Sequence, residues 1–574
     1  MAFVGKGMRS WTVAIALALA ACSHKSASSN DGGPSDGGGA GVTGGAGVTG
    51  SGGSGGTQAT GAAGGAQATG GGGGAQATGG GGGAGGAAPA AGDSVLMLHR
   101  NPSHDGAYVQ AAFKRSAIAN LDVLASFKAT LPDPNDQVYA QPLYVDGGAG
   151  GTDLVIVATE ANNVYALDAT TGVIAWTKNV GTPVPKAMMS CGNIMPAFGI
   201  TGTPVIDLAS RRVFLAAAVL PASGTPTYQI FALSLADGSI SPGWPLDMST
   251  IGVSGSTTFH ATTQGQRGAL ALARGTLYVP FGGLFGACLP FHGWVVGIPI
   301  ANPTAAKAWA TPASGGGAWA PGGIASDDAS IYVGTGVTFG ATTWGGGDAV
   351  LRFAIGSDLS APADSFAPTN WKTGLDPADL GSGAAPVLFS LAGSTPSSLA
   401  IFFQKDGNAF LLDRANLGGI GNALGATGSG ANGSASLHAS ATPPISAPAV
   451  YTTTTATYVV FRGSNGGCPK AGTLTALEVT PGAPPTLSLA WCGGTGNGSP
   501  MVTTSDGTHD PIVWLPGAEG SNQLEAFDGD LGTPVTFAGG TKTITGMRRY
   551  NSAIAAKGRL YVASDGAVTA FGLP

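Results

Sequence analysis

Three short apolar stretches joined by tight turns, at residues 154–181, constrain the fold of this chain more than any other feature. Residues 154–159 form an apolar run of strand length, and the pair Asn162 and Asn163 that follows is typical of a turn. A second apolar run ends in Asp-Ala-Thr-Thr-Gly at 168–172, where the aspartate can bond its own backbone and the glycine permits a positive φ. A third strand follows immediately. Such consecutive short strands predict an antiparallel β-meander.

The same segment carries a five-position signature. Ala166, Asp168, Thr171, Gly172 and Trp176 match, in register, the pattern Ala-x-Asp-x-x-Thr-Gly-x-x-x-Trp. The segment therefore resembles the repeat of pyrroloquinoline-quinone-type, or quinoprotein-like, β-propellers. The resemblance implies a four-stranded blade whose tryptophan packs between neighbouring blades.

Weaker copies of this unit follow at intervals of roughly 45–65 residues. Their first strands are expected at 202–207, 268–272, 321–324, 385–389, 447–450, 499–502 and 552–554. These units predict an all-β, eight-bladed β-propeller of four-stranded antiparallel blades, with a seven-bladed ring as the alternative. The stretches 141–145, 191–207, 290–294 and 413–418 also resemble a bacterial subgroup of such propellers, which is described mostly by its fold.

The last unit has only three strands before Pro574. Near the other end, residues 121–130 alternate in part between apolar and polar and precede the first complete unit. Placing this segment in the last blade supplies its fourth strand and removes an exposed backbone edge. We therefore predict that an N-terminal strand closes the last blade and that the chain enters the folded body there.

The first residues are typical of an export signal. Lys6 and Arg9 precede an apolar stretch at 11–18 that is too short to span a bilayer. The sequence Leu-Ala-Ala-Cys at 19–22 then resembles the bacterial lipobox, which implies a lipoprotein signal peptide at 1–21 and lipidation of Cys22. A serine directly after the lipidated cysteine resembles the signal for outer-membrane sorting in a Gram-negative cell. An ordinary secretory peptide cut at a small-residue site is the alternative.

Residues 22–92 consist mostly of Gly, Ala, Ser and Thr and include near-copies of the unit Ala-Gln-Ala-Thr-Gly-Gly-Gly-Gly-Gly. Because this segment has little apolar surface to bury, the entropy cost of ordering it cannot be offset. We expect a disordered linker there, which leaves residues 93–574 for the propeller.

The four remaining cysteines are Cys191, Cys288, Cys468 and Cys492. Their even number favours two disulfides in an oxidising compartment. Sequence order suggests Cys191 with Cys288 and Cys468 with Cys492, although four cysteines allow three connectivities. Four buried free thiols are the alternative.

Few residues point to chemistry. Only 10% of the residues are charged and the net charge is -6, without a long basic run, which argues against nucleic-acid binding. We interpret His292 as a turn histidine, Trp294 as inter-blade packing, Asp327 as a solvated turn residue and Lys405 as part of an Asp-Gly hairpin turn. The alternatives are a place near the channel mouth for His292 and Trp294, a metal role for Asp327 and a cofactor contact for Lys405.

Quinoprotein alcohol dehydrogenases share the expected fold, and that resemblance would imply pyrroloquinoline quinone and Ca²⁺ at the ring centre, held by Glu, Asn and Asp. Many of them would also have a disulfide between adjacent cysteines, which this sequence lacks, as it lacks a CxxCH haem motif. We therefore predict no cofactor or metal and assign no catalytic residue.

The function favoured is a membrane-anchored binding or scaffold module of the cell envelope, with a protein or glycan partner. A quinone- and Ca²⁺-dependent dehydrogenase and a carbohydrate-binding or carbohydrate-active propeller are the alternatives.

Overall fold

The computed structural model describes residues 92–356, 358–424, 435–464, 467 and 472–574. The expected signal peptide, the lipid attachment site Cys22, nearly all of the expected linker, and Cys468 lie outside these residues. Within them, no helix is long and apolar enough to cross a membrane.

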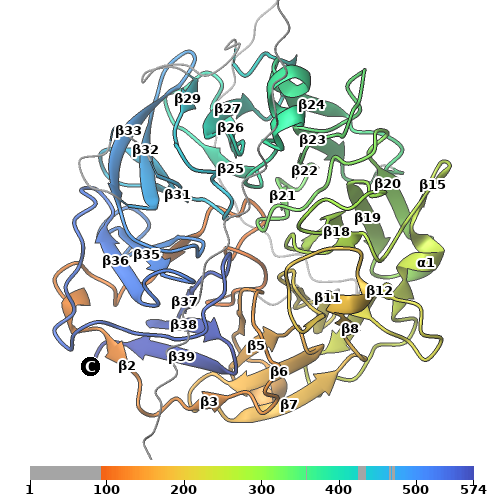
Figure 1. Ribbon diagram of the computed structural model, residues 1–574. Coiled ribbons are helices and arrows are strands. Elements are labelled where there is room, and N and C mark those ends of the chain that lie inside the picture. Colours follow the sequence, from red (N-terminus) through yellow and green to blue (C-terminus); the bar gives the residue numbers. More distant parts are fainter. Residues whose placement is uncertain (1–91, 357, 425–434, 465–466, 468–471) are drawn as a thin grey trace, which may run out of the picture. The chain divides into compact units, whose positions relative to one another are not determined.

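Eight β-sheets follow one another around a ring, and their first strands, from β4 of blade 1 to β37 of blade 8, follow in sequence order (Figure 1). The eight-bladed prediction is thereby confirmed, and the seven-bladed alternative is wrong.

Blade 1 contains β4 (Leu143–Val145), β5 (Leu154–Ala158), β6 (Asn163–Asp168) and β7 (Ile174–Asn179). Blade 2 contains β10 (Val205–Asp207), β11 (Arg212–Val219), β12 (Thr227–Ser234) and β13 (Leu246–Asp247). Blade 3 contains β16 (Gln264–Gly265), β17 (Ala271–Ala273), β18 (Thr276–Gly283), β19 (Trp294–Pro299) and β20 (Lys307–Ala310). Blade 4 contains β21 (Ile324–Ser326), β22 (Ser330–Thr335), β23 (Ala349–Ala354), β24 (Asp364–Ala367) and β28 (Gly419–Ile420).

The second half of the ring repeats this plan. Blade 5 contains β25 (Val387–Ser390), β26 (Ser398–Phe403), β27 (Asn408–Asp413) and β29 (Ser436–His438). Blade 6 contains β30 (Ala449–Thr452), β31 (Thr457–Arg462), β32 (Leu474–Thr480) and β33 (Thr486–Gly493). Blade 7 contains β34 (Met501–Thr504), β35 (Ile512–Pro516), β36 (Leu524–Asp528) and β1 (Ala107–Val109). Blade 8 contains β37 (Ile554–Ala556), β38 (Arg559–Ser564), β39 (Ala567–Gly572), β2 (Asp122–Val123) and β3 (Ala129–Thr130).

Short elements decorate the loops. Two hairpins pair β8 (Val184–Pro185) with β9 (Ala197–Phe198) and β14 (Val253–Ser254) with β15 (Thr257–Thr258). The helical turns are α1 (Met248–Ile251), Ile118–Asn120, Ala149–Gly151, Lys186–Met188, Pro303–Ala305, Trp371–Leu375 and Asp376–Ala378.

The middle strands of each blade are apolar on both faces because every sheet packs between two neighbouring sheets. All residues of β5 are buried, as are seven of the eight residues of β11. The outer strand β7 instead alternates between exposed and covered residues, since its edge lies on the ring's circumference. The core is therefore a series of inter-blade layers rather than one central cluster.

Residues 122–130 join the C-terminal strands in blade 8. Strand β2 pairs antiparallel with the last strand, β39, through Asp122 opposite Gly572 and Val123 opposite Phe571, and β3 pairs with β39 as well. The predicted closure by an N-terminal strand is confirmed, although it takes the form of two short strands. The expected entry point is wrong, because Val95 already exchanges backbone hydrogen bonds with Tyr144 of blade 1.

Residues 95–110, here called the axial strap, run around the inside of the ring. Backbone carbonyls of the strap accept hydrogen bonds from the inner strands of blades 2, 4, 5, 6 and 7. The N–H donors and carbonyl acceptors are Ile206 to Leu96, Ser326 to Pro102, Leu388 to Ser103, Val450 to Asp105 and Val502 to Gly106. Strand β1, at the end of the strap, adds to blade 7 in parallel with β34. The strap thus ties the inner edges of separate blades together.

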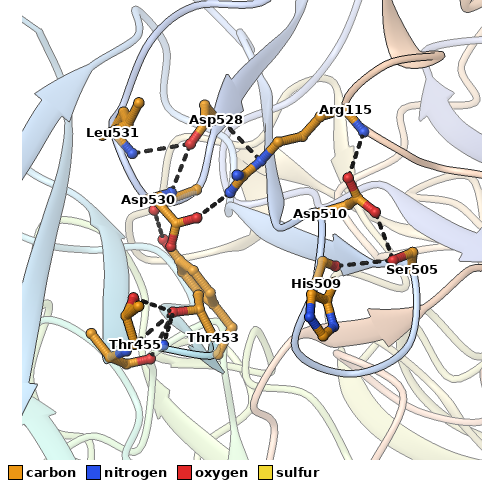
Figure 2. A network of polar contacts seen from close by, with 12 residues as sticks. Arg115, Thr453, Thr455, Ser505, His509, Asp510, Asp528, Asp530 and Leu531 are labelled. Atoms are coloured by element: carbon orange, nitrogen blue, oxygen red, sulfur yellow. Dashed lines mark hydrogen bonds and ion pairs between the residues drawn. The ribbon is translucent and has the colours of Figure 1, made fainter.

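Beyond the strap, Arg115 fastens the chain to blade 7 (Figure 2). Its guanidinium forms ion pairs with Asp528, at 3.0 Å, and with Asp530. Its backbone N–H donates to the Asp510 carboxylate at 3.1 Å. These contacts hold the segment that leads from the strap to β2.

Candidate functional site

One end of the ring, called the upper face here, gathers two kinds of loop. Neighbouring strands within a blade are antiparallel, so the loops between second and third strands open on the same end as the segments that lead from blade to blade. The loops between first and second strands open on the opposite, lower face.

Four side chains from distant blades form a ladder of cations and aromatic rings on the upper face. The guanidinium of Arg267, which lies between β16 and β17, is 5.3 Å from the Tyr550 ring centre and 6.0 Å from that of Trp319. The Lys405 ammonium, from the turn between β26 and β27, lies 5.6 Å from the Trp319 ring centre. Each cation is attracted to the electron-rich face of a ring. We call this group the axial mouth.

Further cations surround the axial mouth, and most have carboxylate partners. The Lys405 ammonium pairs with Asp379 at 2.6 Å, and Arg548 and Arg549 form ion pairs with Asp565 and Glu519. Arg548 also lies 5.6 Å from the Tyr139 ring centre.

Arg267 and Arg462 lie close to Tyr550 and have no carboxylate partner among the described residues. Arg462 donates instead to the Asn497 amide oxygen at 2.8 Å and the Pro443 carbonyl at 2.9 Å. Among the residues that the structure describes, Arg267 makes no ion pair. The surroundings of Tyr550 therefore include two cations, Arg267 and Arg462, that no contacting carboxylate neutralises.

The axial strap forms the floor beneath the mouth. Leu98 packs against Ala269 of blade 3 and Ala447 of blade 6, so its side chain contacts two separated parts of the ring. The space left between Leu98, Arg267 and Tyr550 is a cavity of about 10 Å³. Such a cavity holds one water molecule at most, so the mouth presents a surface and not a deep pocket.

Glu160 is a buried acid at the edge of the same face. It sits in the loop between β5 and β6 and is 3% exposed. Burial raises its pKa to about 7, even though the Gly199 N–H donates to one carboxylate oxygen at 2.7 Å. The other oxygen has no hydrogen-bond partner among the described residues. Glu160 can therefore bind or release a proton near neutral pH.

Asp348 and Asp376 form a carboxyl pair between blades 4 and 5. Asp348 is fully buried, and burial together with the Asp376 carboxyl raises its pKa to about 9. Asp376 accepts hydrogen bonds from the Thr338 N–H at 2.8 Å and the Thr338 hydroxyl at 3.1 Å. Two neighbouring carboxylates repel each other, and burial disfavours the charged form of Asp348 further. Asp348 is therefore the protonated partner at neutral pH.

Of the residues that the sequence singled out, only Lys405 belongs to the axial mouth. His292 is held by hydrogen bonds, with its ring Nδ1 2.8 Å from the Thr311 carbonyl, and Trp294 is fully buried in the core. Asp327 caps its own turn and accepts from the Tyr332 hydroxyl at 2.9 Å.

Arg267, Trp319 and Tyr550 were not predicted as functional residues. Each lies in a loop segment before an inner strand, with no motif around it, and only the closed ring brings the three together.

The signature residues of the repeat stabilise the blades. Asp168 accepts from the backbone N–H groups of Thr170 and Thr171 at 2.9 and 2.8 Å, and Gly172 adopts φ +77°. The Trp176 indole donates to the Leu235 carbonyl of blade 2 at 3.0 Å. Trp176 thus lies between two blades. Ala166 is fully buried in β6.

Cys191 and Cys288 form a disulfide, as sequence order suggests. It links the segment before blade 2 to the loop between β18 and β19, and both belong to the upper face. Pairing of Cys468 with Cys492 stays a prediction, because Cys468 lies outside the described residues.

The axial mouth does not fit a quinone with Ca²⁺. A bound cofactor of that size needs a cavity of roughly 300 Å³ or more, whereas the space above Leu98 measures about 10 Å³. Among the described residues, no three His, Cys, Asp or Glu side chains converge as metal ligands.

No protein-family model matches the chain, and neither does any curated protein. Solved structures with a similar fold include the quinohemoprotein alcohol dehydrogenase of Comamonas testosteroni, with 15% identity, a TM-score of 0.53, and coverage of 83% of this chain and 80% of that one. A quinohemoprotein alcohol dehydrogenase of Pseudomonas putida has 13% identity, a TM-score of 0.56, and coverage of 84% and 80%. A europium-containing methanol dehydrogenase has 14% identity, a TM-score of 0.55, and coverage of 83% and 90%. At these identities the likeness shows the fold alone: this chain has the β-propeller fold of the quinoprotein dehydrogenases.

Proposed function

We propose that this protein is an exported, lipid-anchored binding module of the cell envelope, attached to the membrane through Cys22. Its axial mouth binds an anionic group on an envelope partner. The observation that carries the proposal is the pair of cations, Arg267 and Arg462, that no contacting carboxylate neutralises among the described residues. Anions approach such a surface favourably because positive side chains on a low-dielectric body focus the field.

The same geometry favours an anion over a glycan. Sugars stack on the open faces of aromatic rings, but cations already lie over Trp319 and Tyr550. The small cavity above Leu98, about 10 Å³, disfavours a quinone dehydrogenase because a quinone would not fit into it. Binding at the surface of the mouth requires neither open ring faces nor a deep cavity.

A comparison of purified full-length variants tests the proposal. The double variant Arg267→Gln, Arg462→Gln removes the two charges near Tyr550, and Arg274→Gln removes an exposed cation of the lower-face turn between β17 and β18 as the matched control. We expect a partner captured from envelope extract to bind the double variant at least about tenfold more weakly, with salt-sensitive binding retained by the control. Equal capture by all three proteins would contradict the proposal.

Reconstitution addresses the dehydrogenase alternative directly. The full-length protein is mixed with pyrroloquinoline quinone and Ca²⁺, and alcohol-dependent dye reduction is measured. We expect no stoichiometric quinone binding. Stoichiometric binding with alcohol-dependent reduction would overturn the binding-module proposal.

A further inference from the structure

Blade 7 has an interrupted outer edge. Its third strand, β36, is followed by residues 533–544, which occupy the place of a fourth strand but touch β36 only at two ends. Val535 N–H donates to the Ala526 carbonyl, and Leu524 N–H donates to the Lys542 carbonyl, both at 2.8 Å. Between these contacts the chain turns away, and Ala538 bonds to Ala119 instead at 2.7 Å.

The interruption leaves two backbone groups of β36 unpaired, on residues that are themselves almost fully buried. In an antiparallel strand, the N–H and C=O of one residue point to the same side. The Ala526 N–H and the Leu524 C=O therefore face the segment that turns away. Neither has a hydrogen-bond partner among the described residues. Unpaired groups of this kind on a strand edge are a template for another extended chain.

A cavity of about 470 Å³ opens at this gap, between blades 6 and 7. Its apolar wall includes Leu524, Phe527, Val535 and Phe537, and Gly493 and Gly494 line it from blade 6. The cavity therefore offers apolar surface beside the free backbone groups.

The charged residues at the cavity set the charge of a ligand. The Lys542 ammonium is neutralised by Asp122 at 2.8 Å. The Glu525 carboxylate accepts from the Thr495 N–H at 3.0 Å, the Thr495 hydroxyl at 2.8 Å and the Ser521 hydroxyl at 2.6 Å. These donors are neutral, and no cation among the described residues contacts Glu525. The cavity therefore keeps one negative charge.

We propose that this cavity binds a short extended peptide segment of a partner protein that carries a basic side chain. One peptide carbonyl accepts from the Ala526 N–H, and the N–H two residues further along donates to the Leu524 carbonyl. The basic side chain pairs with Glu525, and apolar neighbours contact Phe527 and Val535. The site is separate from the axial mouth and does not depend on it.

The probe is a blocked heptapeptide of alternating valine and lysine, and the same peptide with glutamate in place of lysine serves as its control. Binding to the full-length protein is measured by fluorescence anisotropy, and hydrogen exchange is followed at the Ala526 amide. We expect saturable binding of the lysine peptide only, with exchange at Ala526 slowed at least about tenfold.

Two matched variants locate the contact. Glu525→Gln keeps the hydrogen-bond acceptor but removes the charge, so the lysine peptide binds about tenfold more weakly. Glu478→Gln, on β32 of blade 6, leaves binding unchanged, as does Arg267→Gln at the axial mouth. Absence of saturable binding, equal binding of both peptides, or an unprotected Ala526 amide would overturn the proposal.

Discussion

Two buried histidines lie in the axial strap, where the strap passes through the ring. His99 and His104 are almost fully buried, with backbone φ angles of +51° and +58°. Burial lowers the pKa of His99 to about 4 and that of His104 to about 3, and the charge of His99 adds to the second shift. Both rings are therefore neutral in the folded protein at neutral pH. Protonation of either places an uncompensated charge in the core.

We expect the free energy of unfolding to fall as the pH drops below about 6.5. The unfolded chain binds protons with the ordinary histidine pKa, and the folded chain resists them down to about pH 4, so acid favours unfolding by about 1.4 kcal/mol per pH unit for each histidine. His104→Asn keeps a residue that tolerates positive φ and removes one titrating ring. Denaturant unfolding is measured between pH 4 and 7. The free energy of unfolding should change less steeply with pH in this variant, and as steeply as in the wild type in the exposed-site control His438→Asn. Equal slopes in both variants would contradict the assignment.

Asp348 makes the free energy of unfolding depend on pH with the opposite sign. Its folded pKa of about 9 lies above the ordinary aspartate value, so the folded state holds an extra proton between about pH 4 and 9 and loses stability as the pH rises. Asp348→Asn is neutral at every pH, so it removes both the buried charge and the repulsion with Asp376. Stability at pH 8 should rise by about 1–3 kcal/mol and its fall with pH should flatten, whereas the exposed Asp358→Asn should do neither. A destabilised Asp348→Asn variant would show that Asp348 is not the protonated partner.

A tryptophan and a glycine join blades at two places in the ring. Trp176 donates to the Leu235 carbonyl at 3.0 Å, and its ring lies where a side chain at Gly238 would be. Trp491 donates in the same way to the Gly529 carbonyl at 2.9 Å, with Gly532 under its ring. The signature tryptophan therefore acts between blades, and the turn of the next blade needs a glycine to receive it.

The contact predicts a difference between two glycines of blade 2. A Cβ at Gly238 would lie 2.6 Å from the Trp176 ring, whereas a Cβ at Gly224 would meet nothing within 4 Å, and both residues have positive φ. Gly224→Ala should cost about 1 kcal/mol of unfolding free energy for the backbone alone. Gly238→Ala should cost about 1–3 kcal/mol more. Equal losses in chemical denaturation would mean that the tryptophan contact carries no stability.

The elements were predictable because their signals are local. Asp168, Gly172 and the apolar runs around them determine one blade by period and turn chemistry, and seven weaker copies place the others. The sequence did not predict that an irregular segment replaces the fourth strand of blade 7. The contacts of this segment with β36 stop between Val535 and Lys542, where Ala538 bonds to Ala119, and this is a matter of tertiary packing.

At the scale of the whole molecule, the chain closes its own ring. Strands β2 and β3 complete blade 8, and the axial strap ties the inner strands together. The strap could not be foreseen, because residues 95–110 form few regular elements and gain their hydrogen bonds only from blades far along the chain. The axial mouth was hidden for the same reason, since Arg267 and Tyr550 are neighbours only in the closed ring.

Removal of residues 554–574 should abolish cooperative unfolding. The deletion takes away β37, β38 and β39, which hold Leu560, Tyr561 and Phe571 in the core and pair with β2 and β3. The inner faces of blades 1 and 7 then lose their neighbour. Urea unfolding monitored by tryptophan fluorescence should lose its single sharp transition. A truncated chain with an unchanged transition would refute closure through blade 8.

Photo-crosslinking in living cells tests most directly whether the upper face is the binding face. A photoreactive benzoylphenylalanine replaces Ala378, exposed beside Asp379 on the upper face, or Ser210, exposed in the lower-face turn between β10 and β11. We expect one discrete envelope protein to be crosslinked from position 378, none from position 210, and loss of the product when Arg267→Gln is added. Equal products from both positions, or a product that Arg267→Gln leaves unchanged, would contradict a binding module that acts through the axial mouth.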